Sequence, residues 1–547
     1  MVDFDYDRHR FGFAEFGKSE TAAAGGLHDA PTGLFLGFDN ANKICRSRQQ
    51  APVLLCGGAR SGKGNHIIPW FVDGAIDDHV ISMDWKSQNG SISHLQHDPT
   101  VRIINWAPRG SNFPTNRINP VSYLKRESKR LVADAKLFTQ SWIPLNGSKE
   151  GEYFQATAQR FLEACVVHYA EKYGEVDLPG LADLMSVFAT EVQDWVDFEQ
   201  SMALESDYSF IQSIALELVT LRKSDNPNAG GFAGAKGEIL KSFSCMTDPQ
   251  IREVVRPPFD FCFSELTERN APRTQVNVQE AMEYAQTSAP IVKALYTCAL
   301  VYKRRSLRSR PQLWVLDEIG NIGAWPLAVE LGTYGPGFGI RPIYIVQSVR
   351  QIDNLKVGAS SILPNSCGTQ IYKGIREYSE ALRISNMLGH MTLEVTDTVR
   401  DQRIRDQIAE KSTEIEFDGA DPLLAGMAIE NLKAQIGMTT PVQRHLLTPS
   451  EITTKLGKHR CILFMPDDLA SPMVLNVPDY WTRSDLAGRY LGDIYHDDDG
   501  EVSIADGRGG SRKAKVLTEP VPRSRRHLPQ HADGLWRYVA GHKPKPS

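Results

Sequence analysis

The residues from Gly57 to Lys63 have the spacing of a phosphate-binding loop, G-x-x-x-x-G-K. An apolar run at 53–56 precedes the loop, and a helix can begin near Gly62. Glycines let the backbone wrap until its N–H groups face phosphate oxygens. The helix N-terminus adds a positive dipole end, and Lys63 adds a mobile charge. The predicted nucleotide-binding residues are Gly57, Gly58, Ala59, Arg60, Ser61, Gly62, Lys63, Gly64 and Asn65.

The loop lacks one part of the usual pattern. The Ser or Thr whose hydroxyl ligates Mg²⁺ is Gly64 here. Without that hydroxyl the pattern arises by chance in roughly one chain in ten. On the motif alone, an ordinary glycine turn therefore stays open.

A second motif supplies the groups for hydrolysis. The apolar run at 312–316 ends in Asp317 and Glu318. If this strand lies beside the loop, Asp317 reaches Mg²⁺ through water and Glu318 orients or deprotonates the attacking water. Gln347 follows another strand at 342–346, where its amide can sense the γ-phosphate. Lys63, Asp317, Glu318 and Gln347 are the predicted catalytic residues, with ATP and Mg²⁺ as cofactors. Taken alone, the acidic pair is equally a solvated turn.

The order of apolar runs predicts the architecture. Strand-like segments at 53–56, 80–83 and 101–104 precede a helical block from 125 to 259, which includes helix-period segments at 155–173 and 181–198. Strand-like segments then return at 312–316, 342–346, 369–372 and 461–464. We expect an α/β motor domain of the P-loop NTPase, RecA-like class, formed by 33–124 and 260–490. An all-α domain at 125–259 interrupts it.

The two ends of the chain differ from the middle in composition. Residues 1–32 are polar and Gly/Ala-rich, and predict a flexible arm. Residues 491–547 predict a basic, disordered tail, because ten basic and two acidic residues follow Gly507. The tail could hold DNA phosphates or an acidic partner, or it could only be solvated.

Composition narrows the class of protein. A net charge of −5 argues against coating by nucleic acid along the whole chain. The eight cysteines form no C-x-x-C pair and do not cluster with histidine in the sequence, which fits a reducing compartment. No stretch approaches the ~20 apolar residues of a membrane span. The sequence predicts a cytoplasmic protein whose membrane contact comes only through partners.

Beyond these two motifs, the chain resembles the coupling proteins of type IV secretion, the TraG/TraD family of conjugative DNA pumps. ARSGKGNHIIPW is similar to that family's extended loop, in which Gly64 is usual and Pro69 follows. VISMDWKSQNG resembles its second strand, with Asp84 and Lys86. LWVLDEIGNIG, GFGIRPIYIVQSVRQI, NSCGTQIYKGIREYSEALRISNMLG and CILFMPDDLASPMVLNVPDYW resemble later parts of the same motor.

The resemblance implies a function. It implies a homo-hexameric ATPase that recruits a DNA-linked relaxase and delivers the DNA, expected to be single-stranded, to components of a secretion channel. The helical block would receive the substrate. Members usually begin with membrane-spanning helices, which this chain lacks, so peripheral docking at the inner membrane is an expectation.

A second departure concerns the arginine finger. The family often has arginine where this chain has Pro336, so Arg341 or Arg376 is the candidate for the finger. Arg341 could equally be a strand-entry residue. His66, just after the loop, is expected to pack against the sheet rather than to bind a ligand. Two other functions stay open, namely an ATP-binding recruitment platform with little hydrolysis and a soluble DNA pump or helicase outside secretion.

Overall fold

The apolar runs pair into one sheet of eleven strands. A computed structural model describes residues 9–95, 100–111, 113–145, 149–224, 231–417, 421–495, 497 and 500–544. In spatial order the strands are β2 (Ile44–Ser47), β1 (Leu34–Phe38), β13 (Met473–Asn476), β12 (Arg460–Phe464), β9 (Thr369–Lys373), β3 (Val53–Gly57), β8 (Ile340–Val346), β7 (Gln312–Leu316), β4 (His79–Asp84), β6 (Thr274–Gln279) and β5 (Arg102–Trp106).

The sheet is parallel from β9 to β5 and antiparallel from β12 to β2. Every strand-like run from the sequence overlaps one of its strands, and only the run at 101–104 begins one residue early. Strand β7, which ends in the acidic pair, is separated from the loop strand β3 by β8. Its carboxyl end still lies close enough to the loop for Glu318 to contact Lys63.

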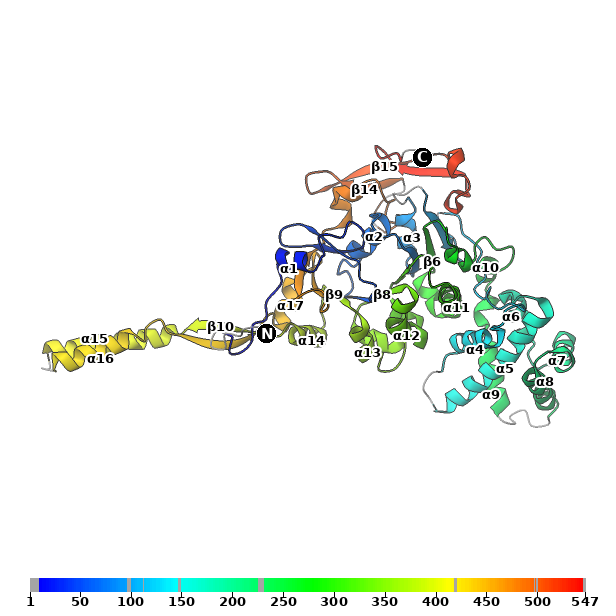
Figure 1. Ribbon diagram of the computed structural model, residues 1–547, viewed down its shortest axis with the longest axis horizontal. Helices are drawn as coiled ribbons and strands as arrows, with labels where there is room; N and C mark the ends of the chain where they lie inside the picture. The colour runs from blue at the N-terminus through cyan, green and yellow to red at the C-terminus, as the bar shows by residue number, and fades with distance from the viewer. Residues whose placement is uncertain are drawn as a thin grey trace. The chain divides into compact units, whose positions relative to one another are not determined.

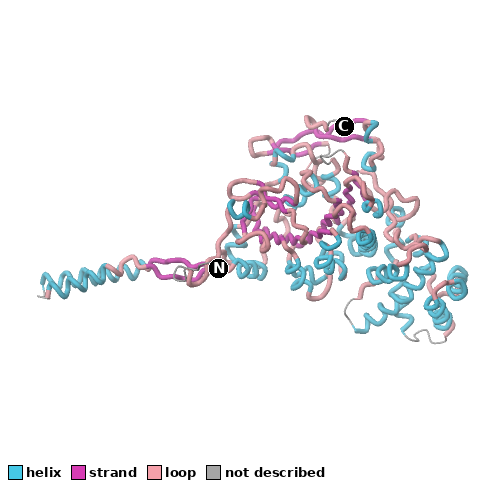
Figure 2. The backbone as a smooth tube through the Cα atoms, viewed as in Figure 1, coloured by secondary structure: helices cyan, strands magenta, loops and turns pink. Residues whose placement is uncertain are grey.

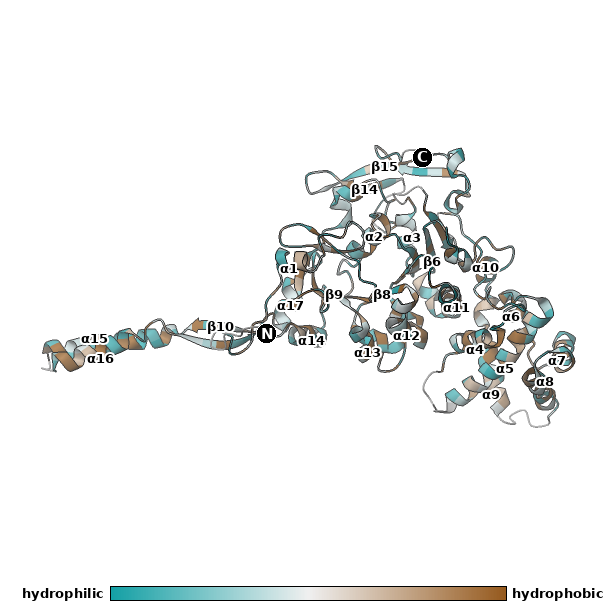
Figure 3. Cartoon of the chain, in the orientation of Figure 1, coloured by the Kyte–Doolittle hydropathy of each residue, from teal (hydrophilic) through white to brown (hydrophobic). Residues whose placement is uncertain are grey.

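Helices cover both faces of the sheet (Figures 1 and 2). On one face lie α2 (Gly64–Val72) and α3 (Gln88–Ser93), and on the other lie α11 (Ala285–Arg305), α12 (Pro326–Tyr334) and α13 (Ala359–Ser366). Val53 and Leu55 share a buried cluster with Trp70 and Phe71 of α2. Because both faces are covered, strands such as β3 are continuous apolar runs rather than alternating ones (Figure 3).

The block expected to be all-α contains helices joined by turns and no strand of a sheet among its described residues. Its helices are α4 (Leu131–Trp142), α5 (Lys149–Tyr173), α6 (Leu178–Ser186), α7 (Gln193–Glu205), α8 (Ser209–Arg222), α9 (Phe232–Ser242) and α10 (Pro249–Val254). The segment 181–198, expected as one helix, is split between α6 and α7. The break brings the rings of Phe188 and Trp195 to 4.7 Å in a buried T-shaped contact, which one straight helix would not allow.

Among the described residues, 9–17, 375–417, 421–457 and 470–472 form a second compact unit. It contains α14 (Tyr378–Leu388), α17 (Pro449–Lys455) and a two-stranded ribbon of β10 (His390–Thr396) and β11 (Thr439–His445). Between these two strands the chain forms α15 (Thr398–Phe417) and α16 (Pro422–Lys433), which lie side by side (Figure 1). Sequence reasoning placed this region inside the motor domain and missed the ribbon and the hairpin. Ile404 is the buried residue of the hairpin among those described.

The C-terminal segment is folded, contrary to the expectation of a disordered tail. Strands β14 (Glu501–Ala505), β15 (Ser511–Pro520) and β16 (Leu535–Val539) form an antiparallel sheet (Figure 1). Val502, Ile504 and Val539 are fully buried and belong to the apolar cluster of the motor core. The expectation was wrong because this alternation of apolar residues is short and lies among charges.

Part of the positive charge in this segment is also neutralised locally. Ion pairs join Lys513 to Asp497 at 2.5 Å, Arg537 to Asp533 at 3.0 Å and Lys543 to Glu519 at 2.7 Å. Lys545, the last basic residue, lies outside the described residues.

The expected N-terminal arm is also partly ordered. Its first eight residues lie outside the described part of the chain. Ser19–Ala24 form the short helix α1, and Ala22 and Leu27 are buried in the apolar cluster of the motor core. Two small anchors of this kind in a Gly/Ala-rich stretch leave no clear periodicity in the sequence.

The buried position of Ile504 predicts that the C-terminal sheet contributes to stability. We expect Ile504→Ala to lower the free energy of unfolding by about 2–5 kcal/mol, because the truncation leaves a cavity in the core. Chemical denaturation followed by circular dichroism measures the change. Lys515→Ala on exposed β15 is the control, with an expected change within ~0.5 kcal/mol. Equal midpoints for the two variants would contradict the packing of this sheet onto the core.

Candidate nucleotide-binding site

The predicted loop connects the end of β3 to the start of α2. Glycine is required at both ends of the motif. A Cβ on Gly57 would lie 2.7 Å from Ser61 Oγ and 2.8 Å from the carbonyl oxygen of Lys373. Gly62 has a φ of 77°, and a Cβ there would lie 2.9 Å from the carbonyl oxygen of Lys458. The spacing seen in the sequence is therefore a steric requirement of this loop.

Parallel pairing brings the predicted catalytic residues to the same edge of the sheet. Lys63 Nζ donates to the carbonyl of Gly57 at 2.9 Å and forms an ion pair with Glu318 Oε1 at 3.0 Å. Gln347 Nε2 donates to Glu318 Oε2 at 3.1 Å. The carboxylate of Glu318 thus lies between the lysine of the loop and the glutamine of β8. Three residues from widely separated segments meet as predicted.

Glu318 has an unusual backbone conformation. Its φ of 45° is in the left-handed region, which non-glycine residues seldom occupy. Asp317 follows the last residue of β7, and the chain turns after it. This turn directs the carboxylate of Glu318 to Lys63. Backbone strain of order 1–3 kcal/mol at such a residue is typical of active sites.

Asp317 fits a cation site. Within the described residues its buried Oδ1 has no hydrogen-bond partner. Burial and the neighbouring carboxylate of Glu318 raise the pKa of Asp317 to about 7, and the nearby Lys86 and Lys63 oppose that shift. An unsatisfied buried carboxylate oxygen is costly unless a cation or a water satisfies it. The residue therefore has the chemistry that Mg²⁺ held through water requires.

Other predicted residues have structural contacts. The Asp84 carboxylate accepts hydrogen bonds from the backbone N–H groups of Lys86, Gln88 and Gly90 and so caps the start of α3. Lys86 itself is exposed. His66 is fully buried, with Nε2 2.9 Å from the carbonyl oxygen of Leu36, which confirms that it packs inside the protein.

Asn65 and the two candidate arginines differ in their surroundings. Asn65 Nδ2 donates to Asp479 Oδ1 at 2.8 Å. Arg341 is the second residue of β8 and is only 4% exposed, and its guanidinium donates to the backbone carbonyls of Ala51 and Ser47. The carboxyl end of the same strand faces the site, so Arg341 lies at the opposite edge of the sheet. It is a strand-entry residue, and the alternative of an arginine finger at this position was wrong.

Arg376 is exposed, three residues beyond the end of β9. Its side chain is thus free of the burial that excludes Arg341. Pro336 begins a short 3₁₀ turn at Pro336–Phe338 before β8.

Sequence reasoning missed Lys373. This residue ends β9 and is fully buried, and its Nζ donates to the carbonyl of Gly62 at 2.8 Å. The run TQIYK shows only a strand that ends in a lysine. Knowing that β9 pairs with β3 is necessary to place that lysine beside the loop.

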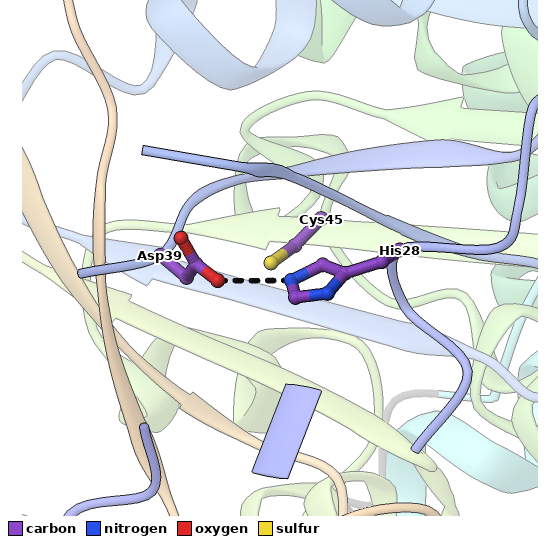
Figure 4. Close-up of side chains that lie close together, drawn as sticks. All are labelled: His28, Asp39 and Cys45. Atoms are coloured by element: carbon purple, nitrogen blue, oxygen red, sulfur yellow. Dashed lines mark hydrogen bonds and ion pairs between the residues drawn. The ribbon is translucent and has the colours of Figure 1, made fainter. Parts of the chain in front are cut away.

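A group of possible metal ligands lies elsewhere in the motor core (Figure 4). His28, Asp39 and Cys45 have ligand atoms within 4.8 Å of one another. Asp39 Oδ1 accepts hydrogen bonds from the backbone N–H groups of Ala41 and Lys43, and His28 Nε2 lies 2.9 Å from Oδ2. Burial raises the pKa of Cys45 to about 12, which keeps the thiol protonated, whereas a metal needs the thiolate. These contacts close the turn between β1 and β2.

The architecture is similar to that of known coupling proteins. The bacterial conjugative coupling protein TrwBdeltaN70, in its unbound monoclinic form, matches with a TM-score of 0.57 and 13% identity over 86% of this chain and 95% of that one. TrwB in complex with the non-hydrolysable ATP analogue ADPNP matches with a TM-score of 0.56 and 13% identity over 86% and 96%. TrwB in complex with ADP and Mg²⁺ matches with a TM-score of 0.54 and 14% identity over the same shares.

These likenesses establish the fold, a RecA-like P-loop motor with an inserted all-α domain. No protein of curated function matches the sequence. Among the described residues, no helix has both the length and the apolar content needed to cross a bilayer. Residues 18–435 match the family model described as type IV secretory system conjugative DNA transfer. Because that match covers most of the chain, this protein belongs to the conjugative DNA transfer family of type IV secretory systems.

Proposed function

We propose that this protein is the ATP-hydrolysing coupling protein of a conjugative system, which delivers DNA with its relaxase to the secretion channel. The observation that carries the proposal is the meeting of Lys63, Glu318 and Gln347 at the carboxyl edge of a parallel sheet. Family membership supplies the role in DNA transfer. The complexes of TrwB with ADPNP and with ADP and Mg²⁺ support ATP and Mg²⁺ as ligands of this site.

Each residue of the site has its own role in the proposed mechanism. The backbone of Gly57 to Lys63 and the start of α2 bind phosphates, and Lys63 leaves Glu318 to contact the β and γ phosphates. Asp317 would hold Mg²⁺ through water, and a bound Mg²⁺ would supply positive charge to the phosphates. Glu318 orients the attacking water and accepts its proton. Gln347, already bonded to Glu318, senses the γ-phosphate from β8.

The proposed assembly of several copies rests on the family to which the chain belongs. A ring of six copies would let one copy supply an arginine to the nucleotide of its neighbour, and exposed Arg376 is the candidate. The α4–α10 block would receive the relaxase, and contact with the inner membrane would come through channel components. We propose single-stranded DNA as the transferred form.

DNA-stimulated hydrolysis tests the proposed function. We expect wild-type protein to hydrolyse ATP faster when single-stranded DNA is added, and Lys63→Ala to abolish this turnover because the phosphates lose their mobile cation. Phosphate release measures the rate. The absence of DNA-stimulated turnover at any protein concentration would contradict the translocase and leave the recruitment platform. Copurification of a relaxase with the intact chain then separates secretion from a DNA pump outside it.

The position of Glu318 predicts that binding and hydrolysis can be separated. We expect Glu318→Gln to lower kcat by about 10²–10⁴-fold, because the amide cannot accept the proton of water. ATP affinity should stay equal or rise, since the variant lacks the carboxylate charge that holds Lys63 in the free protein. Rapid-quench kinetics and titration with a fluorescent ATP analogue measure the two effects. A parallel loss of affinity would assign Glu318 to nucleotide binding rather than to hydrolysis.

If Arg376 is the arginine finger, its contribution to ATP turnover depends on assembly of the ring. We expect Arg376→Ala to lower ATP turnover by about 10³-fold or more in assembled protein, with nucleotide binding by the monomer unchanged. Arg403→Ala on exposed α15 is the control for loss of a surface cation. Turnover plotted against protein concentration measures the effect. Equal turnover of the two variants would remove Arg376 as the finger.

A further inference from the structure

Lys373 lies directly against the phosphate-binding loop. It is the last residue of β9 and pairs in register with Gly57, the first residue of the motif. A Cβ on Gly57 would lie 3.2 Å from Lys373 Cγ, so the lysine stem passes along the start of the loop. The ammonium then reaches the other end of the motif, where it donates to the carbonyl of Gly62 at 2.8 Å.

This hydrogen bond determines the direction of a peptide group in the loop. In a trans peptide the C=O and the following N–H point in opposite directions. The carbonyl of Gly62 faces Lys373, so the N–H of Lys63 points away from Lys373. Lys63 Nζ holds the carbonyl of Gly57 in the same way. Each end of the loop therefore has its carbonyl bonded by a lysine.

The charge of Lys373 is not neutralised by contact with a carboxylate. Within the described chain, no ion pair within 4.0 Å involves its ammonium. Burial lowers the pKa of Lys373 to about 8, and the Cys461 thiol of β12 and the Asp479 carboxylate partly oppose that shift. His66 of α2 faces the same region, and its own pKa is well below the usual value because it is buried near Lys373. Phosphates in the loop would be the strongest anions near this ammonium.

We propose that Lys373 is a positioning residue for the nucleotide, which holds the Gly62 carbonyl away from the phosphates and adds positive charge behind the loop. The inference rests on the proposed function of the site as an ATPase. It adds a second lysine, from another strand, to a loop whose metal-binding hydroxyl is replaced by Gly64. No feature of the P-loop motif itself contains this residue.

The chain offers a matched control. Lys293 of α11 is also buried, burial lowers its pKa to about 8, and its Nζ donates to one backbone carbonyl, that of Ala324, at 2.7 Å. Its acceptor lies outside the loop. Lys293→Met and Lys373→Met thus remove the same type of buried lysine and the same type of hydrogen bond, but only one of them belongs to the loop.

Calorimetric titration of the full chain with ADP in EDTA tests the proposal without Mg²⁺. We expect Lys373→Met to weaken ADP binding by about 10–100-fold at pH 7, because a hydrogen bond from a charged donor and a nearby charge are lost. Lys293→Met should bind ADP within about twofold of wild type. Lys373→Gln, which keeps an N–H donor, should recover part of the affinity. Thermal unfolding of each variant shows whether it is folded.

Proton uptake on ADP binding distinguishes the proposed role, because Lys373 would not change the uptake if its role were purely structural. With a pKa of about 8, part of the Lys373 population is a neutral amine at pH 8.5, and bound phosphates favour the ammonium. Wild-type protein and Lys293→Met should therefore take up a fraction of a proton on binding ADP, measured as the dependence of the heat on buffer ionisation enthalpy. At pH 6.5 Lys373 is already charged, so its share disappears. Lys373→Gln should remove the uptake at pH 8.5.

The outcomes are separable. If wild-type protein does not bind ADP or ATP, the proposed function itself fails. If it binds nucleotide with no proton uptake at pH 8.5, or if Lys373→Met binds as tightly as Lys293→Met, only the role of Lys373 is overturned. The measurement on wild type decides the matter even where Lys373→Met does not fold.

Discussion

Parallel pairing of the central strands is the constraint on which the site depends. When β9, β3, β8 and β7 run in the same direction, their carboxyl ends lie at one edge, and the residues that follow them meet there. Lys63, Gln347 and Glu318 come from three such ends. Arg341, at the opposite end of β8, is excluded from the site by the length of the same strand, although it is only six residues from Gln347 in the sequence.

Side chains of opposite charge are buried together and in contact in the site. The ammonium of Lys63 forms an ion pair with the carboxylate of Glu318, and the amide of Gln347 donates to the same carboxylate. In the proposed function, a nucleotide that draws Lys63 to its phosphates would also free Glu318 for water, so this one ion pair would couple nucleotide binding to hydrolysis. Asp317 Oδ1 is buried without a hydrogen-bond partner among the described residues, which fits the proposed cation site.

The fold also changes how the charges of the C-terminal segment are understood. In the sequence, basic residues strongly outnumber acidic residues after Gly507. In the folded protein Lys513, Arg537 and Lys543 form ion pairs, and apolar residues such as Ile504 anchor the sheet to the motor core. The positive charge available to a partner is smaller than the count of lysines and arginines indicates.

The sequence by itself determined the phosphate loop, the acidic pair and the class of fold. Those signals are local, because G-x-x-x-x-G-K is a short segment with fixed spacing, and a strand covered on both faces is typically rich in apolar residues, as at 313–316. Tertiary structure decided what depends on strand order and on contacts between distant segments. Placing β8 between β7 and β3, placing Lys373 beneath the loop and burying Arg341 all follow from which strands pair, and strand pairing leaves no trace within any one segment. Likewise, the β10–β11 ribbon and the C-terminal sheet are stabilised by partners far along the chain, so their own residues show only weak patterns.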